Sequence, residues 1–486
     1  MTRKQFLSTA AAPMVRPRNA QGGHPRNVLL LMSDQHRPHA LSIDGDPVAR
    51  TPNLDALARS GVRFDDAYCT NPVCTPSRAS LLTGLYTHNH RTWNNGTPWP
   101  FEIKTMAHRF GRAGYMCALI GKMHYVDSQT HGFDYQVEFN DWYQYLGPKT
   151  RLYADELGKP NSGSGMPQVP AFWRDGDPWQ EVREKDGRQG LVHVGRVSKI
   201  PERDHFDNFL ARESVRFLKE HGKRQPFFLV TSMLKPHDPF MPAGRFAQMY
   251  RAADMKLPET WGKVDLKTVP AHIRQSIETN GPTPELSDPE QAKLRIALYY
   301  ASLAQMDECA GQVLAALEEL GLAQDTIVVY TSDHGEMLGE HGLWQKFVFY
   351  EPSAGVPLIL RVPGLTPGNA RSRTPVSLVD LFPTLCELCG VTAPAGLDGG
   401  SLAPDLREPG RLRQRTVYAE FNLHSPRPKL MMREGDYKYC YYRGDIAEMY
   451  NLREDPKEMR NLALAAEFKD RAAEMESRLL GWHRPA

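Results

Sequence analysis

The chain has 486 residues, of which 41% are hydrophobic and 24% charged, and its formal net charge is +2. This length suffices for one large domain or a large domain with a smaller companion, and the composition is that of an ordinary soluble globular protein. The small net charge gives no reason to expect nucleic acid or a membrane surface as a partner. No apolar run approaches the roughly 20 residues of a membrane span.

Residues 1–24 are predicted to form an export signal or a tail. Arg3 and Lys4 precede a short apolar stretch, a pattern that resembles a twin-arginine signal whose second arginine is a lysine. Pro13 and Arg16 interrupt the apolar stretch, so a disordered tail is the alternative. We therefore expect a periplasmic or secreted protein, with the cytoplasm as the alternative location.

Strands and helices are predicted to alternate from residue 27 onward. Asn27–Met32 is a continuous apolar run of strand length, which suits a sheet buried on both faces. A helix follows, with Thr51 as N-cap, Pro52 at its first position and Gly61 as its stop. Further helices are predicted at 106–114, 205–222 and 289–321, and further strands at 115–121, 226–232 and 326–333. The alternation predicts an α/β fold whose sheet is covered by helices on both faces.

Two long stretches and the C-terminal end depart from this alternation. Residues 134–200 are rich in Trp, Tyr, Gly and Pro, and residues 240–288 are rich in Pro, so we expect long loops that wall a pocket. After residue 410 come strand candidates at 416–421, 429–435 and 437–442 and a final amphipathic helix near 465–480. We therefore divide the chain into a tail or export signal at 1–24, a catalytic domain at 25–410 and a small antiparallel-sheet-plus-helix subdomain at 411–486.

Seven cysteines are scattered along the chain, and their odd number leaves at least one thiol unpaired in a monomer. Cys386 and Cys389 lie in an apolar stretch with helical spacing, which favours small buried residues on a helix. A redox pair or half of a zinc site is the alternative interpretation of this C-x-x-C.

Reactive polar side chains stand just after the predicted strands. Seven such residues follow four strands: Asp34, Gln35, Lys122, His124, His237, Asp333 and His334. Because ligands bind outside the carboxyl ends of the strands in open α/β sheets, we expect these side chains to gather at one edge of the sheet.

The chemistry of these side chains suits a metal-assisted attack on a tetrahedral ester. Two carboxylates, an amide oxygen and an imidazole form an oxygen-rich donor set for Ca²⁺ or Mn²⁺, and the set comprises Asp34, Gln35, Asp333 and His334. Fixed positive charge for an oxyanion is offered by Arg78, Lys122 and Lys346. His124 and His237 can move protons near neutral pH. This inventory predicts hydrolysis of a sulfate or phosphate ester.

The nucleophile is indicated by residues 72–84, which read PVCTPSRASLLTG. This segment resembles the sulfatase signature, in which Cys-x-Pro-x-Arg directs oxidation of the cysteine, here Cys74, to formylglycine. A hydrated aldehyde has two hydroxyls: one attacks sulfur, and the other later expels sulfate as the aldehyde reforms. A thiol lacks the second hydroxyl, so covalent catalysis would stall. A buried structural cysteine is the alternative.

The resemblance to sulfatases covers nearly the whole chain from Asn27 onward. Further family segments are matched at 114–124 (GYMCALIGKMH, with Cys117 where Ser or Thr is usual), 235–239 (KPHDP), 332–346 (SDHGEMLGEHGLWQK) and 450–463 (YNLREDPKEMRNLA). The resemblance implies an alkaline-phosphatase-like fold, with a large mixed, mostly parallel sheet between helices.

The resemblance also implies a role for each candidate site residue. The metal would be bound by Asp34, Gln35, Asp333 and His334 together with the formylglycine oxygen at Cys74. Arg78 and Lys122 would hold the formylglycine, and His124 would take the proton that triggers release of sulfate. His237 and Lys346 would bind the sulfate and help protonate the leaving alcohol. Asn95 would contact substrate, with an ordinary surface loop residue as the alternative.

The Asp-Gln and Asp-His pairs are closest to the choline sulfatase and phosphonate monoester hydrolase branch. Many sulfatases have Asp in place of Gln35 and Asn in place of His334. With one carboxylate fewer, Mn²⁺ competes with the expected Ca²⁺. We expect hydrolysis of a sulfate monoester, because the phosphonate branch lacks the pair formed here by Lys122 and His124. A phosphonate monoester or phosphodiester hydrolase is one alternative, and a non-catalytic protein with unmodified Cys74 is another.

The expected partners are a sulfate ester and a formylglycine-generating maturase. The alcohol is open among choline, a carbohydrate and an aryl group, and we favour a sulfated carbohydrate if the protein is exported. Aromatic side chains of the 134–200 stretch suit a choline cage, a sugar-binding wall or plain packing, and they are Trp142, Tyr143, Tyr145, Trp173 and Trp179.

Overall fold

A computed structural model describes residues 26–125, 129–153, 156, 195–279 and 284–483. The predicted tail or export signal at 1–24 lies outside these residues, as do Trp173 and Trp179. Among the helices of the described ranges, none has the length and apolar character needed to cross a membrane.

The centre of the molecule is an eight-stranded sheet with the order β5-β4-β6-β1-β7-β8-β2-β9. Its strands are β1 (Asn27–Asp34), β2 (Val62–Phe64), β4 (Met116–Gly121), β5 (Tyr135–Val137), β6 (Phe227–Pro236), β7 (Thr326–Ser332), β8 (Leu358–Arg361) and β9 (Ala370–Ser372). Only β8 runs antiparallel to both of its neighbours, and the other pairings are parallel. The predicted mixed, mostly parallel sheet is therefore confirmed.

Strand β1 lies in the middle of this sheet because its residues are apolar on both faces. Leu29 pairs with Leu229 of β6 on one side and with Val328 of β7 on the other. Every residue of β1 is buried, which requires a helical layer on each side of the sheet.

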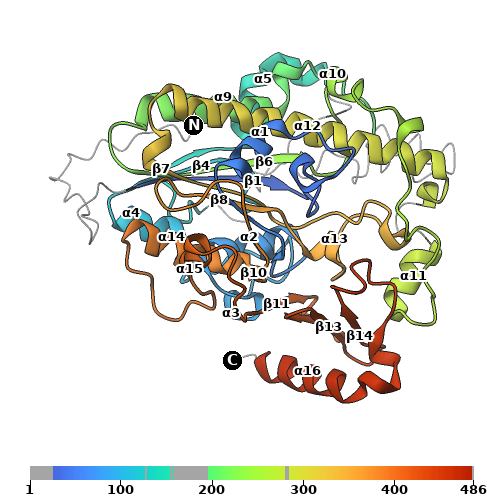
Figure 1. The fold of residues 1–486 in the computed structure, drawn as a ribbon. Coiled ribbons are helices and arrows are strands. Elements are labelled where there is room, and N and C mark those ends of the chain that lie inside the picture. The colour runs from blue at the N-terminus through green and yellow to red at the C-terminus, as the bar shows by residue number, and fades with distance from the viewer. Residues whose placement is uncertain (1–25, 126–128, 154–155, 157–194, 280–283, 484–486) are drawn as a thin grey trace.

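Helices cover both faces of the sheet, as Figure 1 shows. One layer contains α1 (Pro52–Arg59), α5 (Phe139–Leu146), α9 (Phe206–His221) and α12 (Pro289–Glu319). The opposite layer contains α2 (Cys74–Thr83), α4 (Met106–Arg112), α14 (Leu381–Cys389) and α15 (Ala403–Arg407). Two separate hydrophobic cores therefore lie above and below the strands.

Several details of the helices differ from the sequence-based expectations. Helix α1 begins at Pro52 as predicted, but the Thr51 side chain makes no capping hydrogen bond and instead donates to Asp55 Oδ1 at 3.0 Å. The stretches at 134–200 and 240–288 are not loops throughout, since they contain α5 and α11 (Ala271–Thr279). Helix α5 forms because Phe139, Trp142 and Leu146 bury one apolar face, a periodicity that the Trp- and Tyr-rich composition concealed.

The described residues also form three further short helices and a separate two-stranded sheet. They are α3 (Thr87–His90), α10 (Gly244–Ala247), α13 (Glu351–Ala354) and a two-stranded pair of β3 (Ala67–Tyr68) with β10 (Val376–Ser377). Cys386 and Cys389 are buried, unbonded residues of α14, as the simpler interpretation of the C-x-x-C predicts.

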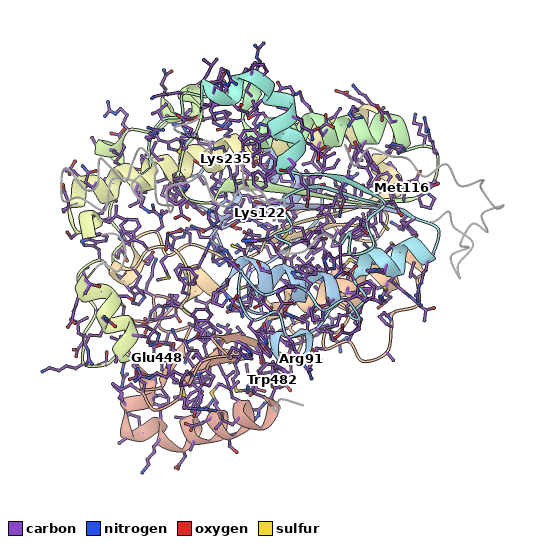
Figure 2. All side chains as sticks on the ribbon, turned by 180° about the vertical axis from the view of Figure 1, so that it is seen from behind. Arg91, Met116, Lys122, Lys235, Glu448 and Trp482 are labelled. Atoms are coloured by element: carbon purple, nitrogen blue, oxygen red, sulfur yellow. The ribbon has the colours of Figure 1, made fainter. Side chains whose placement is uncertain are left out.

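A four-stranded antiparallel sheet follows at the C-terminal end, with α16 (Lys469–Trp482) packed on it. Its strands are β11 (Thr416–Phe421), β12 (Lys429–Glu434), β13 (Tyr437–Tyr442) and β14 (Glu448–Asn451). The sequence did not predict β14. Figure 2 shows Glu448 and Trp482 within this unit, away from Lys122 and Lys235 in the central sheet region. Buried Lys438 links the two parts by donating to Glu351 Oε1 at 2.7 Å.

Candidate active site

The polar residues predicted to follow the strands do gather at one edge of the central sheet. Because β1, β4, β6 and β7 are parallel, their carboxyl ends point the same way. Asp34 ends β1, and Gln35 then turns the chain with a φ of 68°. In Figure 2, Lys122 lies beyond the end of β4 that is opposite Met116. The strand ends therefore bring together side chains that are up to 300 residues apart in the sequence.

Helix α2 places Cys74 at the centre of this edge. Cys74 is the first residue of the helix, and every residue of the helix is buried. Its Sγ lies 3.2 Å from His334 Nε2, 3.6 Å from Lys346 Nζ and 4.0 Å from Lys122 Nζ. Burial raises the pKa of the Cys74 thiol, but Lys122 and Lys346 outweigh burial and hold the pKa well below its ordinary value. The site therefore stabilises negative charge at position 74.

Arg78, one turn further along α2, fixes the two carboxylates. It is fully buried and donates from Nε to Asp333 Oδ2 at 2.8 Å and from Nη2 to Asp34 Oδ2 at 3.0 Å. Lys122 Nζ donates to the same Asp34 oxygen at 2.5 Å. Burial raises the pKa of Asp34, but the nearby cations, Lys122 first, hold it below its ordinary value. Arg78 thus holds both carboxylates in a fixed orientation.

Four groups converge in a geometry that suits a divalent metal. One ligand atom from each of Asp34, Cys74, Asp333 and His334 lies within 4.8 Å of the others, and all four residues are buried. His334 Nδ1 donates to the Gly335 carbonyl at 2.9 Å, which leaves the lone pair of Nε2 free for a metal. The Cys74 sulfur stands where a formylglycine oxygen would lie.

The side chain of Gln35, which the sequence predicts to be a metal ligand, is hydrogen-bonded to three other side chains at the site. Its amide oxygen accepts from Lys346 Nζ at 2.7 Å. Its amide nitrogen donates to Asp238 Oδ1 at 3.1 Å and to Glu336. These contacts fix the amide with its oxygen at the edge of the site, because both of its nitrogen-bound hydrogens face carboxylates.

Lys346 and His237 form a hydrogen-bonded pair beside the nucleophile. His237 Nδ1 donates to the Asp238 carbonyl at 2.5 Å, so its Nε2 accepts from Lys346 Nζ at 3.0 Å. Burial lowers the pKa of Lys346, but the negative groups around it, Cys74 first, raise it above its ordinary value. This pair therefore carries a firmly held positive charge 3.6 Å from Cys74 Sγ.

His124 and Asn95 flank Cys74 on the side of the first helical turn. Burial lowers the pKa of His124, and an interaction with Cys74 opposes this effect. The Asn95 side-chain oxygen accepts the backbone N–H of Thr75 at 3.0 Å. Asn95 thus satisfies a free N–H at the start of α2, one residue from the nucleophile. Its predicted contact with substrate stays a prediction.

Sequence reasoning missed the carboxylates and amides that hold these side chains. Asp238 accepts hydrogen bonds from both Gln35 and Gln345, the latter at 2.7 Å, and Glu336 accepts the backbone N–H of Gln345 at 2.7 Å. Both acids lie inside segments that were singled out, KPHDP and SDHGE. Their place in the sequence could have identified them, because Asp238 directly follows His237 and Glu336 lies two residues after His334.

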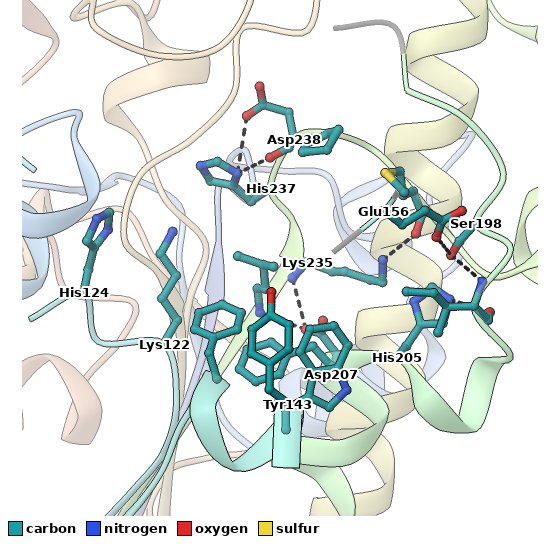
Figure 3. A pocket seen from close by; sticks show the side chains of 17 residues that line it. Lys122, His124, Tyr143, Glu156, Ser198, His205, Asp207, Lys235, His237 and Asp238 are labelled. Carbon is teal, nitrogen blue, oxygen red and sulfur yellow. Dashed lines mark hydrogen bonds and ion pairs between the residues drawn. The ribbon is translucent and has the colours of Figure 1, made fainter. Parts of the chain in front are cut away.

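A pocket of about 110 Å³ opens beside this cluster, as Figure 3 shows. Lys122, His124 and His237 line one end, and Lys235, Glu156 and Ser198 line the other. An aromatic wall connects the two ends and consists of Phe139, Trp142, Tyr143 and Phe206. Of the five aromatic residues proposed from the 134–200 stretch, Trp142 and Tyr143 line the pocket, while Tyr145 contacts Asp204.

Sequence comparisons consistently relate this chain to sulfatases. The family model described as Sulfatase matches residues 26–391, and one described as N-sulphoglucosamine sulphohydrolase, C-terminal, matches residues 339–484. A choline-sulfatase from Rhizobium meliloti is 31% identical over 90% of this chain and 82% of that protein. An arylsulfatase from Clostridium perfringens is 29% identical over 92% of both.

Comparison with solved structures agrees with the fold. A phosphonate monoester hydrolase of Agrobacterium radiobacter superimposes with a TM-score of 0.78 at 25% identity, covering 94% of this chain and 95% of that one. A protein solved with its substrate D-glucosamine-2-N,6-O-disulfate gives a TM-score of 0.71 at 24% identity, covering 94% and 97%. The second likeness concerns the fold alone.

Proposed function

This chain belongs to the sulfatase family and is a sulfuric ester hydrolase, and from that premise we propose that it cleaves a sulfate monoester through a formylglycine made from Cys74. The observation that carries the proposal is the set of cations around one buried side chain. Lys122 and Lys346 both lie within 4.0 Å of Cys74 Sγ, and Arg78 holds the adjacent carboxylates. Such a setting favours a sulfate group and the charge that develops on it.

The residues present fit a divalent metal. Two carboxylates, an imidazole and the position-74 side chain converge, and such a donor set accepts Ca²⁺ or Mn²⁺. Asp34, Asp333 and His334 would hold the ion together with the oxygen at position 74, and Gln35 would join through its amide oxygen. The ion would act as a Lewis acid on the nucleophile and on a sulfate oxygen.

The chain's own residues divide the remaining work. Hydrated formylglycine supplies one hydroxyl that attacks sulfur as the alcohol leaves and a second that expels sulfate as the aldehyde reforms. Lys346 donates a hydrogen bond of 3.0 Å to His237 Nε2, and this pair would protonate the leaving alkoxide. His124 would accept the proton of the second hydroxyl, because its buried, lowered-pKa imidazole is neutral near pH 7. Lys122 would hold position 74 throughout.

A phosphonate monoester or phosphodiester hydrolase is the second candidate. The superposition with a phosphonate monoester hydrolase favours it. The placement of Lys122 and His124 beside Cys74 favours a sulfate ester, because the sequence resemblance leads us to expect no such pair in the phosphonate branch.

Two measurements on the purified protein test the proposal. The first compares turnover of an aryl sulfate, an aryl phosphonate monoester and an aryl phosphodiester. A kcat/KM that is highest for the sulfate supports the proposal, and a preference for either phosphorus ester contradicts it.

The second measurement reads the modification directly. The tryptic peptide Phe64–Arg78 contains both Cys69 and Cys74, so alkylation of unmodified protein adds two groups. After expression with a maturase, we expect one added group and a lighter residue at position 74. Two added groups in an active enzyme would exclude formylglycine as the nucleophile.

A further inference from the structure

Lys235, near the end of β6, is a buried ammonium group that has no ionic partner among the residues that the structure describes. Its side chain is 9% exposed, and Nζ donates one hydrogen bond, to the Met241 carbonyl at 2.8 Å. Within the described ranges of the chain, no carboxylate oxygen lies within 4.0 Å of Nζ. A protonated lysine has three N–H donors, so two of them remain available.

The other buried lysines of the described ranges are more fully compensated. Lys346 contacts the Gln35 amide oxygen, His237 Nε2 and Cys74 Sγ, and the other two are paired with carboxylates. Lys122 lies 2.5 Å from an Asp34 oxygen, and Lys438 lies 2.7 Å from a Glu351 oxygen. Burying an ammonium group without such a partner is costly, and buried lysines are rare unless they are paired. Among the described residues, Lys235 Nζ has one carbonyl acceptor, and this low compensation indicates a further partner outside those residues.

The carboxylates nearest to Lys235 are engaged elsewhere. Asp207 Oδ1 accepts two backbone N–H groups, those of Leu234 at 2.9 Å and of Lys235 itself at 3.0 Å. Glu156 accepts from the Ser198 hydroxyl at 2.6 Å and from the Lys199 N–H at 2.7 Å. Burial lowers the pKa of Lys235, and the charge of Asp207 opposes this effect only in part. The ammonium is thus under-stabilised by the protein alone.

The place of Lys235 in the pocket says what kind of molecule would supply the partner. Lys235 lies at one end of the pocket, and the groups that act on sulfate, Lys122 and His237, line the other end, as seen in Figure 3. Between them, Phe139 and Phe206 stack with ring centroids 4.0 Å apart, and Trp142 packs against Phe206 at 5.2 Å. A molecule that spans the pocket has its sulfate at one end, a flat or apolar middle, and a group at Lys235.

We propose that Lys235 binds a carboxylate on the alcohol part of the substrate, so that the preferred substrates are sulfate esters of hydroxy acids. This inference rests on the proposed function and extends it. One lysine matches the single charge of a carboxylate, and two free N–H donors match its two oxygens. A ring such as that of a hydroxybenzoic acid or a uronic acid fills the aromatic section, and both carry the same recognition element.

The test uses pairs of sulfate esters that differ only in whether they carry a carboxylate or an amide. 4-(Sulfooxy)benzoate and 4-(sulfooxy)benzamide have nearly the same shape, and a sulfated uronic acid is compared with its uronamide in the same way. We expect Lys235→Met to lower kcat/KM for each carboxylate ester by roughly 10- to 100-fold, with little change for the amides. The ratio between variant and wild type cancels any difference in leaving-group chemistry. The pair with the larger effect identifies the ring.

Two control variants isolate the charge at position 235. Lys235→Arg keeps a cation and should retain most of the preference for carboxylates. Lys219→Met removes a charge from an exposed position of α9 and should leave both ratios unchanged. Equal losses on carboxylate and amide esters in Lys235→Met would show a purely structural role and overturn the proposal.

A binding measurement separates this inference from the proposed function. Calorimetry with 4-hydroxybenzoate and 4-hydroxybenzamide requires no turnover. The proposal predicts tighter binding of the benzoate to wild type and loss of this difference in Lys235→Met. Equal binding of both compounds to wild type would overturn it even in an active sulfatase. Slow turnover of every sulfate ester, with selective benzoate binding intact, would instead count against the proposed function.

Discussion

Among the described residues, two clusters combine histidine with carboxylate, and they differ in burial and in surroundings. In the first, two aspartates, His334 and Cys74 converge at the strand ends. In the second, Glu420 of β11 accepts from His88 Nδ1 of α3 at 2.5 Å and from His483 Nδ1 at 2.8 Å. Both sets have residue types that bind metals, so residue type alone does not distinguish them.

The difference lies in the charges around each cluster. The strand-end cluster has two carboxylates that Arg78 and Lys122 hold in place, with Lys346 nearby as a further cation, and four of its ligand atoms lie close together. In the second cluster a single carboxylate oxygen lies at hydrogen-bond distance from both imidazoles, and it is balanced by them. The first cluster is the one that we propose receives a cation and an ester, while the second joins the end of α16 to α3 through Glu420.

The largest expected effect is at Cys74. Cys74→Ala removes the nucleophile of the first cluster, so sulfatase activity should fall by on the order of 10³-fold or more. The melting temperature should change little, because Asp34 and Asp333 keep their partners Arg78 and Lys122. Initial rates and thermal denaturation check both statements. Substantial activity in this variant would move the nucleophile elsewhere.

Lys346→Ala is expected to have the next largest effect. It removes the cation 3.6 Å from Cys74 Sγ and the hydrogen bond to His237. Loss of one such group lowers kcat by about 10²- to 10³-fold. Steady-state kinetics with an aryl sulfate measure this, and Lys457→Ala, a partly exposed lysine beside Glu340, serves as a matched control. Near-normal kcat in Lys346→Ala would contradict its placement at the sulfate.

Removal of divalent metal should lower the activity that depends on the strand-end cluster, and the Glu420 cluster should play no part in this loss. Dialysis against a chelator should reduce activity at least about tenfold, with recovery on adding Ca²⁺ or Mn²⁺. Metal that binds only the folded chain also stabilises it, by about 2.7 kcal/mol at 100 times its dissociation constant. Glu420→Gln should leave both responses unchanged. Full activity after complete removal, confirmed by elemental analysis, would refute the metal assignment.

Glu420→Gln should have the smallest effect on catalysis and a measurable one on stability. The amide keeps a similar shape but loses the charge that faces two imidazoles, so unfolding should become easier by about 1–3 kcal/mol. We expect kcat to be unchanged, because Glu420 touches none of the groups around Cys74. Chemical denaturation and kinetics on the same samples check this, and a large fall in kcat would contradict the separation of the clusters.

The same variant has an expected pH signature. Burial lowers the pKa of His88, but Glu420 outweighs burial and raises it, so this contribution is present below about pH 6.5 and is lost as pH rises through the folded pKa. Burial raises the pKa of Glu420, but the two histidines lower it, so its contribution is lost as pH falls below about 4.5. The stability difference between wild type and Glu420→Gln should therefore be largest between these values. A stability difference between wild type and Glu420→Gln that grows above pH 7 would contradict the direction given for the pKa of His88.

Much of the fold was predictable because its signals are local. The apolar run at Asn27–Met32 predicts a strand buried on both faces, and β1 lies at the centre of the sheet. Helix α5 and strand β14 were missed, because the first is set in a Trp- and Tyr-rich stretch and the second has only four residues. In both cases neighbouring elements supply the burial that a short segment cannot signal alone.

By itself, the sequence determined the chemistry of this protein: the signature around Cys74 and the polar residues after four strands are contiguous patterns with fixed residue types. Only the tertiary structure decided how those residues are used. It turned Gln35 toward Lys346, joined the Asn95 side chain to the Thr75 N–H at the start of α2, and left Lys235 without an ionic partner among the described residues. These outcomes depend on pairings between distant segments, and hydrogen-bond partners in a buried site are settled by geometry that no local pattern encodes.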